Sequence, residues 1–76
     1  MEIITVFRIN RKVDVSGVSG TGVVAFGTVY PNGKVTLCWN TKFNSVAVYD
    51  SMEDVVEIHC HGDSSSIEVV NVIKNE

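Results

Sequence analysis

Apolar and polar residues alternate with a period of two through most of the chain, which is the pattern of β-strands that bury one face. β-Branched residues are frequent in the same stretches, as strand propensity favours. In the third stretch, Val35, Leu37 and Trp39 are expected to point inward. The pattern predicts five short strands, over residues 3–9, 22–30, 34–40, 45–49 and 67–73.

A tight turn is predicted at residues 30–34, where Tyr-Pro-Asn-Gly-Lys separates two of the strands. Pro31 presets φ for a turn, and Asn32-Gly33 tolerates positive φ, so we expect a hairpin with Gly33 in that conformation. Gly27, inside the preceding strand, indicates a bulge or a sharp coil of the kind that small barrels need at their corners.

One short helix is predicted after the fourth strand. Ser51 with Asp54 three residues later resembles a capping box, which marks a helix start. Gly62 stands at a suitable position just beyond the end. Residues at helical spacing follow the start, namely Met52, Val55, Val56 and His59.

The order of these elements predicts one small domain over residues 1–76. Five strands with a helix before the last one indicate a strongly bent β-sheet or barrel, with an SH3-like barrel as the first choice. An OB-like barrel is the alternative, although it usually needs a longer chain. A chain of this length buries only about 60% of its unfolded surface, and 45% of its residues are apolar. We therefore expect a homo-oligomer, in which subunit contacts add to a thin core.

A glycine-rich loop is predicted at residues 14–22, D-V-S-G-V-S-G-T-G. Its glycines permit positive φ and close approach of the backbone, so its N–H groups can form a concave anion-binding nest. The alternative is a tight connection with no ligand. Three basic residues precede the loop, and Arg offers paired contacts to phosphate. They are Arg8, Arg11 and Lys12.

Charge is distributed unevenly along the chain. The net charge is −3, which disfavours a general nucleic-acid-binding role. Residues 1–42 hold five basic and two acidic residues, whereas residues 43–76 hold one basic and seven acidic ones. An anionic ligand is therefore expected in the first half, where the glycine-rich loop lies.

The N-terminal sequence has no basic region followed by an apolar run, and no stretch reaches the roughly 20 apolar residues of a membrane span. We therefore expect a cytoplasmic protein without membrane contact. In that compartment Cys38 and Cys60 are expected to be free thiols.

Metal binding and catalysis are not predicted. His59-Cys60-His61 with Cys38 has the right residue types for zinc, but adjacent ligands cannot easily share one tetrahedron. His61 instead suits the helix C-terminus or a ligand contact made from it. No nucleophile elbow or nucleotide-binding fingerprint occurs. We expect a non-enzymatic protein with no metal and no cofactor.

Three motifs resemble those of a family of small actinobacterial and bacteriophage proteins, and together they span most of the chain. They are V-S-G-V-S-G-T-G over residues 15–22, P-N-G-K-V-x-L-x-W over 31–39 and I-H-C-H-G over 58–62. The chain departs from the family at Cys60, where glycine is usual, and at Cys38, where arginine is usual. The resemblance implies a phage or mobile-element setting, and a single site made by residues 16–22 and 59–62.

Similarity of size and loop type to phage sponges implies a protein that sequesters a small anionic or nucleotide-derived immune signal. The alternative is an SH3-like interaction module that presents Trp39, Phe43 and Tyr49 to a host protein. For the first reading the expected ligand-binding residues are Arg8, Arg11, Ser16, Gly17, Ser19, Gly20, Thr21, Trp39, His59 and His61.

Overall fold

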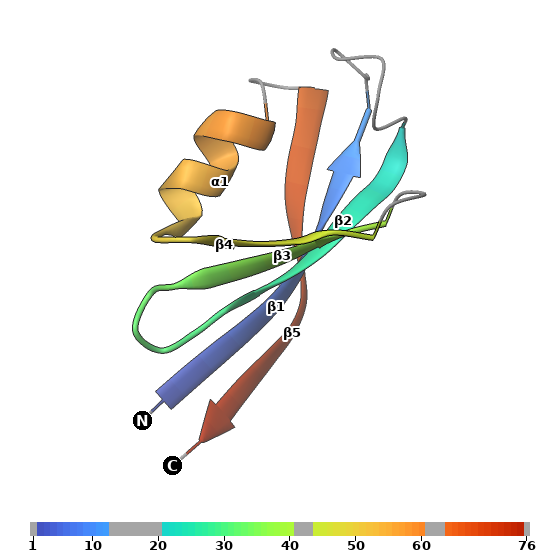
Figure 1. Ribbon diagram of the computed structural model, residues 1–76. Coiled ribbons are helices and arrows are strands. Elements are labelled where there is room, and N and C mark those ends of the chain that lie inside the picture. Colours follow the sequence, from blue (N-terminus) through green and yellow to red (C-terminus); the bar gives the residue numbers. More distant parts are fainter. Residues whose placement is uncertain (1, 13–20, 41–43, 61–63, 76) are drawn as a thin grey trace.

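The computed structural model describes residues 2–12, 21–40, 44–60 and 64–75 (Figure 1). Within them the chain forms five strands and one helix. The elements are β1 (Glu2–Arg11), β2 (Gly22–Val29), β3 (Val35–Trp39), β4 (Val46–Tyr49), α1 (Met52–His59) and β5 (Ser65–Asn75).

The strands form one antiparallel sheet in the order β4-β3-β2-β1-β5. Consecutive strands β1 to β4 are neighbours, and β5 returns after α1 to pair with β1. The predicted mostly-β fold, with five strands and one short helix before the last of them, is confirmed. β1 and β5 extend beyond their predicted bounds because they pair along their whole lengths, from Glu2 opposite Asn75 to Arg11 opposite Ser65.

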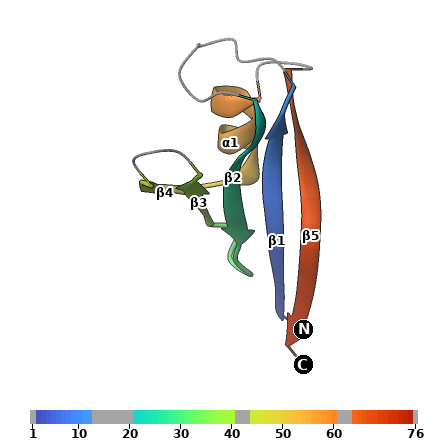
Figure 2. The same ribbon diagram turned by 90° about the vertical axis from the view of Figure 1, so that its right-hand side faces the viewer.

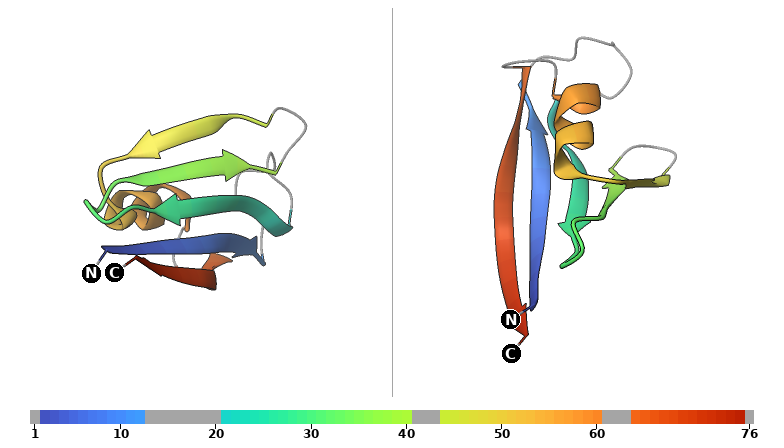
Figure 3. Two further views of the ribbon diagram at one scale, coloured as in Figure 1. Left: turned by 90° about the horizontal axis from the view of Figure 1, so that it is seen from below. Right: turned by 90° about the vertical axis from the view of Figure 1, so that its left-hand side faces the viewer.

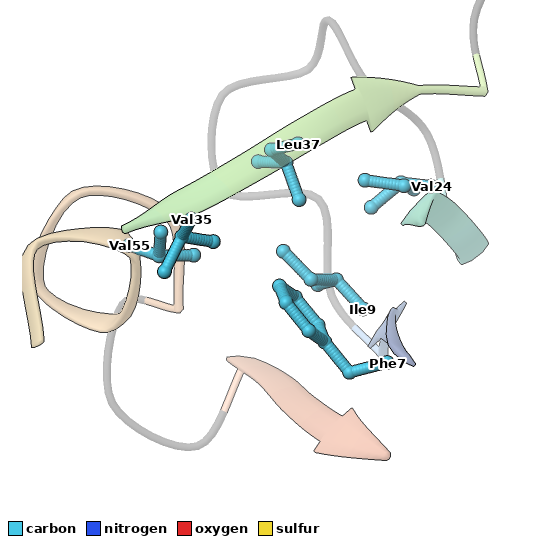
Figure 4. Packing of buried hydrophobic residues seen from close by; sticks show 7 residues of the cluster. Phe7, Ile9, Val24, Val35, Leu37 and Val55 are labelled. Carbon is cyan, nitrogen blue, oxygen red and sulfur yellow. The ribbon is translucent and has the colours of Figure 1, made fainter. Parts of the chain in front are cut away.

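The sheet is bent, and α1 lies inside the bend (Figures 2 and 3). Strands β3 and β4 turn away from β1 and β5, so that one face of the sheet is folded around the helix. The core fills this space, and the sheet supplies all of its members except Val55 of α1 (Figure 4). The fully buried residues include Phe7, Ile9, Val24, Ala25, Val35, Leu37 and Val55.

The helix begins where the sequence predicts it. Ser51 is its N-cap, with φ −154°, and the Ser51 hydroxyl accepts a hydrogen bond from the Asp54 backbone N–H at 3.4 Å. Glu53 and Asp54 lie in the first turn, where carboxylates interact well with the helix dipole. Cys60 is the C-cap, and Gly62 lies outside the described residues.

The predicted hairpin turn is present between β2 and β3. Gly33 has φ +88°, and its N–H donates to the Tyr30 carbonyl at 2.9 Å. The Tyr30 N–H donates to the Lys34 carbonyl, also at 2.9 Å, and Asn32 Oδ1 accepts the Lys34 N–H at 3.0 Å.

Replacing Gly33 with valine is expected to lower the free energy of unfolding by about 1 kcal/mol or more, because a β-branched residue is strained at positive φ. A Cβ at this position meets no atom within 4 Å, so the expected loss comes from the backbone alone. Asparagine tolerates this conformation, so Gly33→Asn is the matched control and should lose less. Thermal melts of the three proteins test this, and equal melting temperatures would argue against the strain.

The predicted bulge at Gly27 is wrong, whereas a sharp coil there stays a prediction. Gly27 lies in regular register, opposite Phe7 on one side and Leu37 on the other. A Cβ at Gly27 would lie only 2.3 Å from Phe7 Cζ, so the position needs glycine for close packing and not for a bulge. The bulge of β2 lies nearby at Val24, where the register with β1 shifts.

A second register shift lies in β5. Val6 is opposite Asn71 and Phe7 is opposite Val69, which leaves Val70 as the extra residue. Beyond the shift, β5 continues to pair with the N-terminal part of β1.

Candidate functional site

Three strand ends and the end of the helix meet at one end of the sheet. β1 finishes at Arg11, which is opposite both Gly22, the first residue of β2, and Ser65, the first residue of β5. We call this the loop end, because the glycine-rich segment leaves β1 and joins β2 here. The last residue of α1, His59, also lies here, because its carbonyl oxygen accepts a hydrogen bond from Arg11.

Arg11 holds the loop end together. Its side chain is buried, with only 5% of the residue exposed. Nε donates to Ser65 Oγ at 3.1 Å, and Nη2 donates to the His59 carbonyl oxygen at 2.9 Å. One guanidinium therefore joins β1, β5 and the C-terminal end of α1, where carbonyl groups lack helical partners and favour a cation.

Backbone contacts reinforce this junction. The Lys12 N–H donates to the Ser64 carbonyl at 2.7 Å, and Ser64 Oγ donates to the Cys60 carbonyl at 2.8 Å. Lys12, on the N-terminal side of the glycine-rich segment, is thus bonded to Ser64, which in turn is bonded across residues 61–63 to Cys60. The expected pairing of 16–22 with 59–62 in one site is compatible with this placement and stays a prediction, since most of these residues are outside the described parts. Those outside are Ser16, Gly17, Val18, Ser19, Gly20, His61 and Gly62.

Arg8 does not join Arg11. It lies on the other face of β1, where its Nε donates to Glu68 Oε1 at 2.6 Å. Asn10 Nδ2 donates to the second oxygen of Glu68 at 3.4 Å. The pKa of the Glu68 carboxyl is lowered, mainly because it accepts the hydrogen bond from Arg8. Glu68 is therefore charged at neutral pH.

An aromatic cluster lies beside the Arg11 junction, between the sheet and the last turn of α1. The rings of Trp39 and His59 meet edge to face, with centroids 4.7 Å apart and an interplanar angle of 73°. Tyr49 and His59 meet in the same way at 5.6 Å and 88°. The Tyr49 hydroxyl is hydrogen-bonded to His59 Nε2 at 2.6 Å, and burial raises the pKa of Tyr49.

The structure therefore brings three of the expected site residues together: Arg11, Trp39 and His59. Thr21 is exposed and lies next to Gly22, which has φ +85°. Tyr49 and Ser65 lie with them. The sequence had suggested Tyr49 as a ring that could stack on a base or as part of a protein-binding surface, but it had not suggested Ser65. Ser65 is 54 residues from Arg11, so no local spacing could indicate their contact.

Both cysteines are free. Cys38 is exposed on the sheet face away from α1, whereas Cys60 is buried at the helix end. Burial raises the pKa of the Cys60 thiol, and the nearby charge of Arg11 partly opposes this. Within the described ranges, no three His, Cys, Asp or Glu residues are grouped as metal ligands would be. No helix in those ranges has the length and apolar character that crossing a membrane requires.

The model of the Acb5 phage protein family matches residues 4–71, which is most of the chain. This confirms the expected relationship to a family of small phage proteins. No curated protein and no solved structure matches the chain.

Proposed function

The chain belongs to the Acb5 phage protein family, and from that premise and the loop end we propose a non-enzymatic protein that sequesters a small anionic ligand. The proposed ligand class is nucleotide-derived, of the kind used as immune signals. Its phosphate would be held by the glycine-rich segment, and its base by the aromatic cluster.

The observation that carries the proposal is the Arg11 junction. It fixes the flanks of the glycine-rich segment beside the end of α1, through the hydrogen bonds to Ser65 and His59. Fixed ends of a binding segment lower the entropy that is lost when a ligand binds. The buried guanidinium also places positive charge where surrounding protein screens it less than water would.

Two further groups at the loop end suit a nucleotide. Lys12 is exposed and directly precedes the glycine-rich segment, so its ammonium group can reach a bound phosphate. Trp39 is half-buried, and aromatic rings of this kind stack on bases with little regard to sequence. Tyr49 and Trp39 contact His59 on the helix side of the sheet, which favours a small ligand over a protein partner.

Binding should be tested by thermal shift and calorimetry with nucleotides, cyclic nucleotides and ADP-ribose derivatives. Gly20→Val is expected to abolish binding without unfolding the sheet, because a nest requires free backbone rotation. Lys12→Ala is expected to weaken binding by about 1.5 to 3 kcal/mol, the usual range for a charge-assisted hydrogen bond.

Lys34→Ala is the matched control, because Lys34 is an exposed lysine at the hairpin end of the sheet, paired there with Asp50. It should leave binding unchanged. The proposal fails if none of these compounds raises the melting temperature while affinity capture returns one stoichiometric host protein.

A further inference from the structure

β5 is a long edge strand whose outer side faces no other strand in the described part of the chain (Figure 3). It has 11 residues, of which five have β-branched side chains. Four of these side chains are about half exposed or more, and no proline interrupts the strand. They are Val69 at 62%, Val70 at 53%, Val72 at 45% and Ile73 at 46%. Such an edge is a template for pairing with another strand, which charged side chains, proline, a bulge or a covering element can oppose. Of these features, β5 carries Glu68, Lys74 and the bulge at Val70.

The C-terminal part of β5 also has little support from the rest of the sheet. β2 reaches β1 only as far as Thr5, which is opposite Val29. Within the described part of the chain, residues 2–4 of β1 and 73–75 of β5 therefore pair with each other and with no third strand (Figure 2). A two-stranded ribbon is marginal in water, and a third strand stabilises it.

We propose that β5 pairs in antiparallel orientation with β5 of a second copy of this chain, so that the two sheets become one continuous sheet. The backbone edge of a strand recognises another strand, and an antiparallel pair of identical edges satisfies a two-fold axis. The side chains of β5 then decide whether its own copy is a suitable partner.

The bulge at Val70 fixes the register of this pairing. The bulge changes which residues of β5 are on the helix side of the sheet. Before it, these residues are Ser65, Ile67 and Val69. After it, they are Val72 and Lys74. Paired residues of two strands must lie on the same face of a sheet. Two copies meet this condition along the whole strand only when their bulges oppose each other, with Val69 of one copy opposite Val70 of the other.

In this register the paired side chains are compatible. Apolar residues meet at the centre, and no two like charges are opposite each other. A side-chain amide is placed opposite Glu68, to which it can donate a hydrogen bond. The resulting pairs are Ser65 with Lys74, Ser66 with Ile73, Ile67 with Val72, Glu68 with Asn71, and Val69 with Val70.

The pairing also changes the loop end. Lys74 of the second copy is placed opposite Ser65, whose Oγ accepts the hydrogen bond from Arg11 at 3.1 Å. Each copy then supplies a lysine to the other's loop end. This consequence, unlike the dimer itself, rests on the proposed anion-binding function.

Light scattering with size-exclusion chromatography tests the dimer. The wild-type protein is expected to be a dimer at micromolar concentration, and Val69→Lys should raise the dissociation constant about a hundredfold or more because it buries unpaired charge. Val46→Lys is the matched control, since Val46 is 64% exposed in the opposite edge strand β4. A monomeric wild type overturns the proposal. The proposal is also overturned if Val46→Lys loses the dimer while Val69→Lys retains it. Circular dichroism must show that both variants stay folded.

Disulfide trapping tests the register in a Cys38→Ser background. Ile73→Cys and Ser66→Cys chains, mixed in equal amounts, should form a heterodimeric disulfide, because paired residues lie within the required Cα distance. Either variant alone should not cross-link, since identical positions are seven residues apart along the strand, about 24 Å. Rapid cross-linking of one variant alone, or none in the mixture, contradicts this register.

The contribution of Lys74 is tested by calorimetry with inorganic phosphate. Lys74→Ala should weaken binding several-fold, whereas Lys34→Ala should not. If the wild type binds neither phosphate nor any of the nucleotide compounds named above but forms the trapped dimer, the proposed function fails and the pairing stands. If phosphate binds equally to wild type and Lys74→Ala, the shared site is wrong.

Discussion

Replacing Gly27 with valine is expected to lower the free energy of unfolding by about 3 kcal/mol or more, at the upper end of overpacking effects. The first added atom would already lie 2.3, 2.7 and 2.9 Å from three carbon atoms of the Phe7 ring. Phe7 is 1% exposed and packs among Ile9, Leu37 and the other core residues, so its ring has no free space to enter (Figure 4). Urea denaturation monitored by Trp39 fluorescence measures the loss.

A double-mutant cycle separates this clash from the general cost of adding a side chain to a strand. Gly27→Ala should lower the free energy of unfolding of the wild-type protein. The loss should be much smaller in a Phe7→Leu background, because leucine lacks the terminal ring atoms. The double variant Phe7→Leu with Gly27→Ala should therefore lose less stability than the sum of the two single losses. Equal losses in both backgrounds would contradict the contact with Phe7.

Replacing Arg11 with methionine is expected to have the second large effect, a loss of about 2 to 4 kcal/mol. Methionine retains an apolar stem of similar length, but it leaves the His59 carbonyl and the Ser65 hydroxyl without their buried donor. Leaving such groups unsatisfied costs about 1 to 3 kcal/mol each. The α1 amides should also exchange faster with solvent, because the helix loses its attachment to β1 and β5.

Arg8→Met is the matched control for this prediction. Arg8 lies on the same strand and also bonds an oxygen, but its side chain is 46% exposed and its partner is a surface carboxylate. Exposed ion pairs contribute little to the free energy of unfolding. The melting temperature of Arg8→Met should therefore remain close to that of the wild type. If the two variants lose equal stability, Arg11 does not have the anchoring role described above.

Local patterns in the sequence predict most of the fold. The alternation of apolar residues places the strands, because each needs one buried face, and Asn32-Gly33 and Ser51 mark a turn and a helix start through their own backbone preferences. These signals are contained within a few residues. They hold in the structure because no distant contact opposes them.

Features that depend on contacts between distant parts of the chain could not be predicted from local sequence patterns. Gly27 resembles a bulge in the sequence, and only the Phe7 ring across the sheet gives the reason for it. Arg11 resembles a polar strand end, yet it is buried because Ser65 and His59 offer it acceptors from the other half of the chain. The separation of Arg8 from Arg11 follows from strand alternation, since residues three apart point to opposite faces.

The pairing of β1 with β5 has a consequence for how fast the protein folds. Partners in this ladder are between 54 and 73 residues apart along the chain, from Arg11 with Ser65 to Glu2 with Asn75. Entropy must be lost to close so large a loop before any of these bonds forms, and domains dominated by such contacts fold in milliseconds to seconds. The β1–β4 meander and α1 can form earlier through nearer contacts. During that interval β1, an interior strand of the finished sheet, has an open edge. A folding chain is most exposed to pairing with the wrong partner at such an edge.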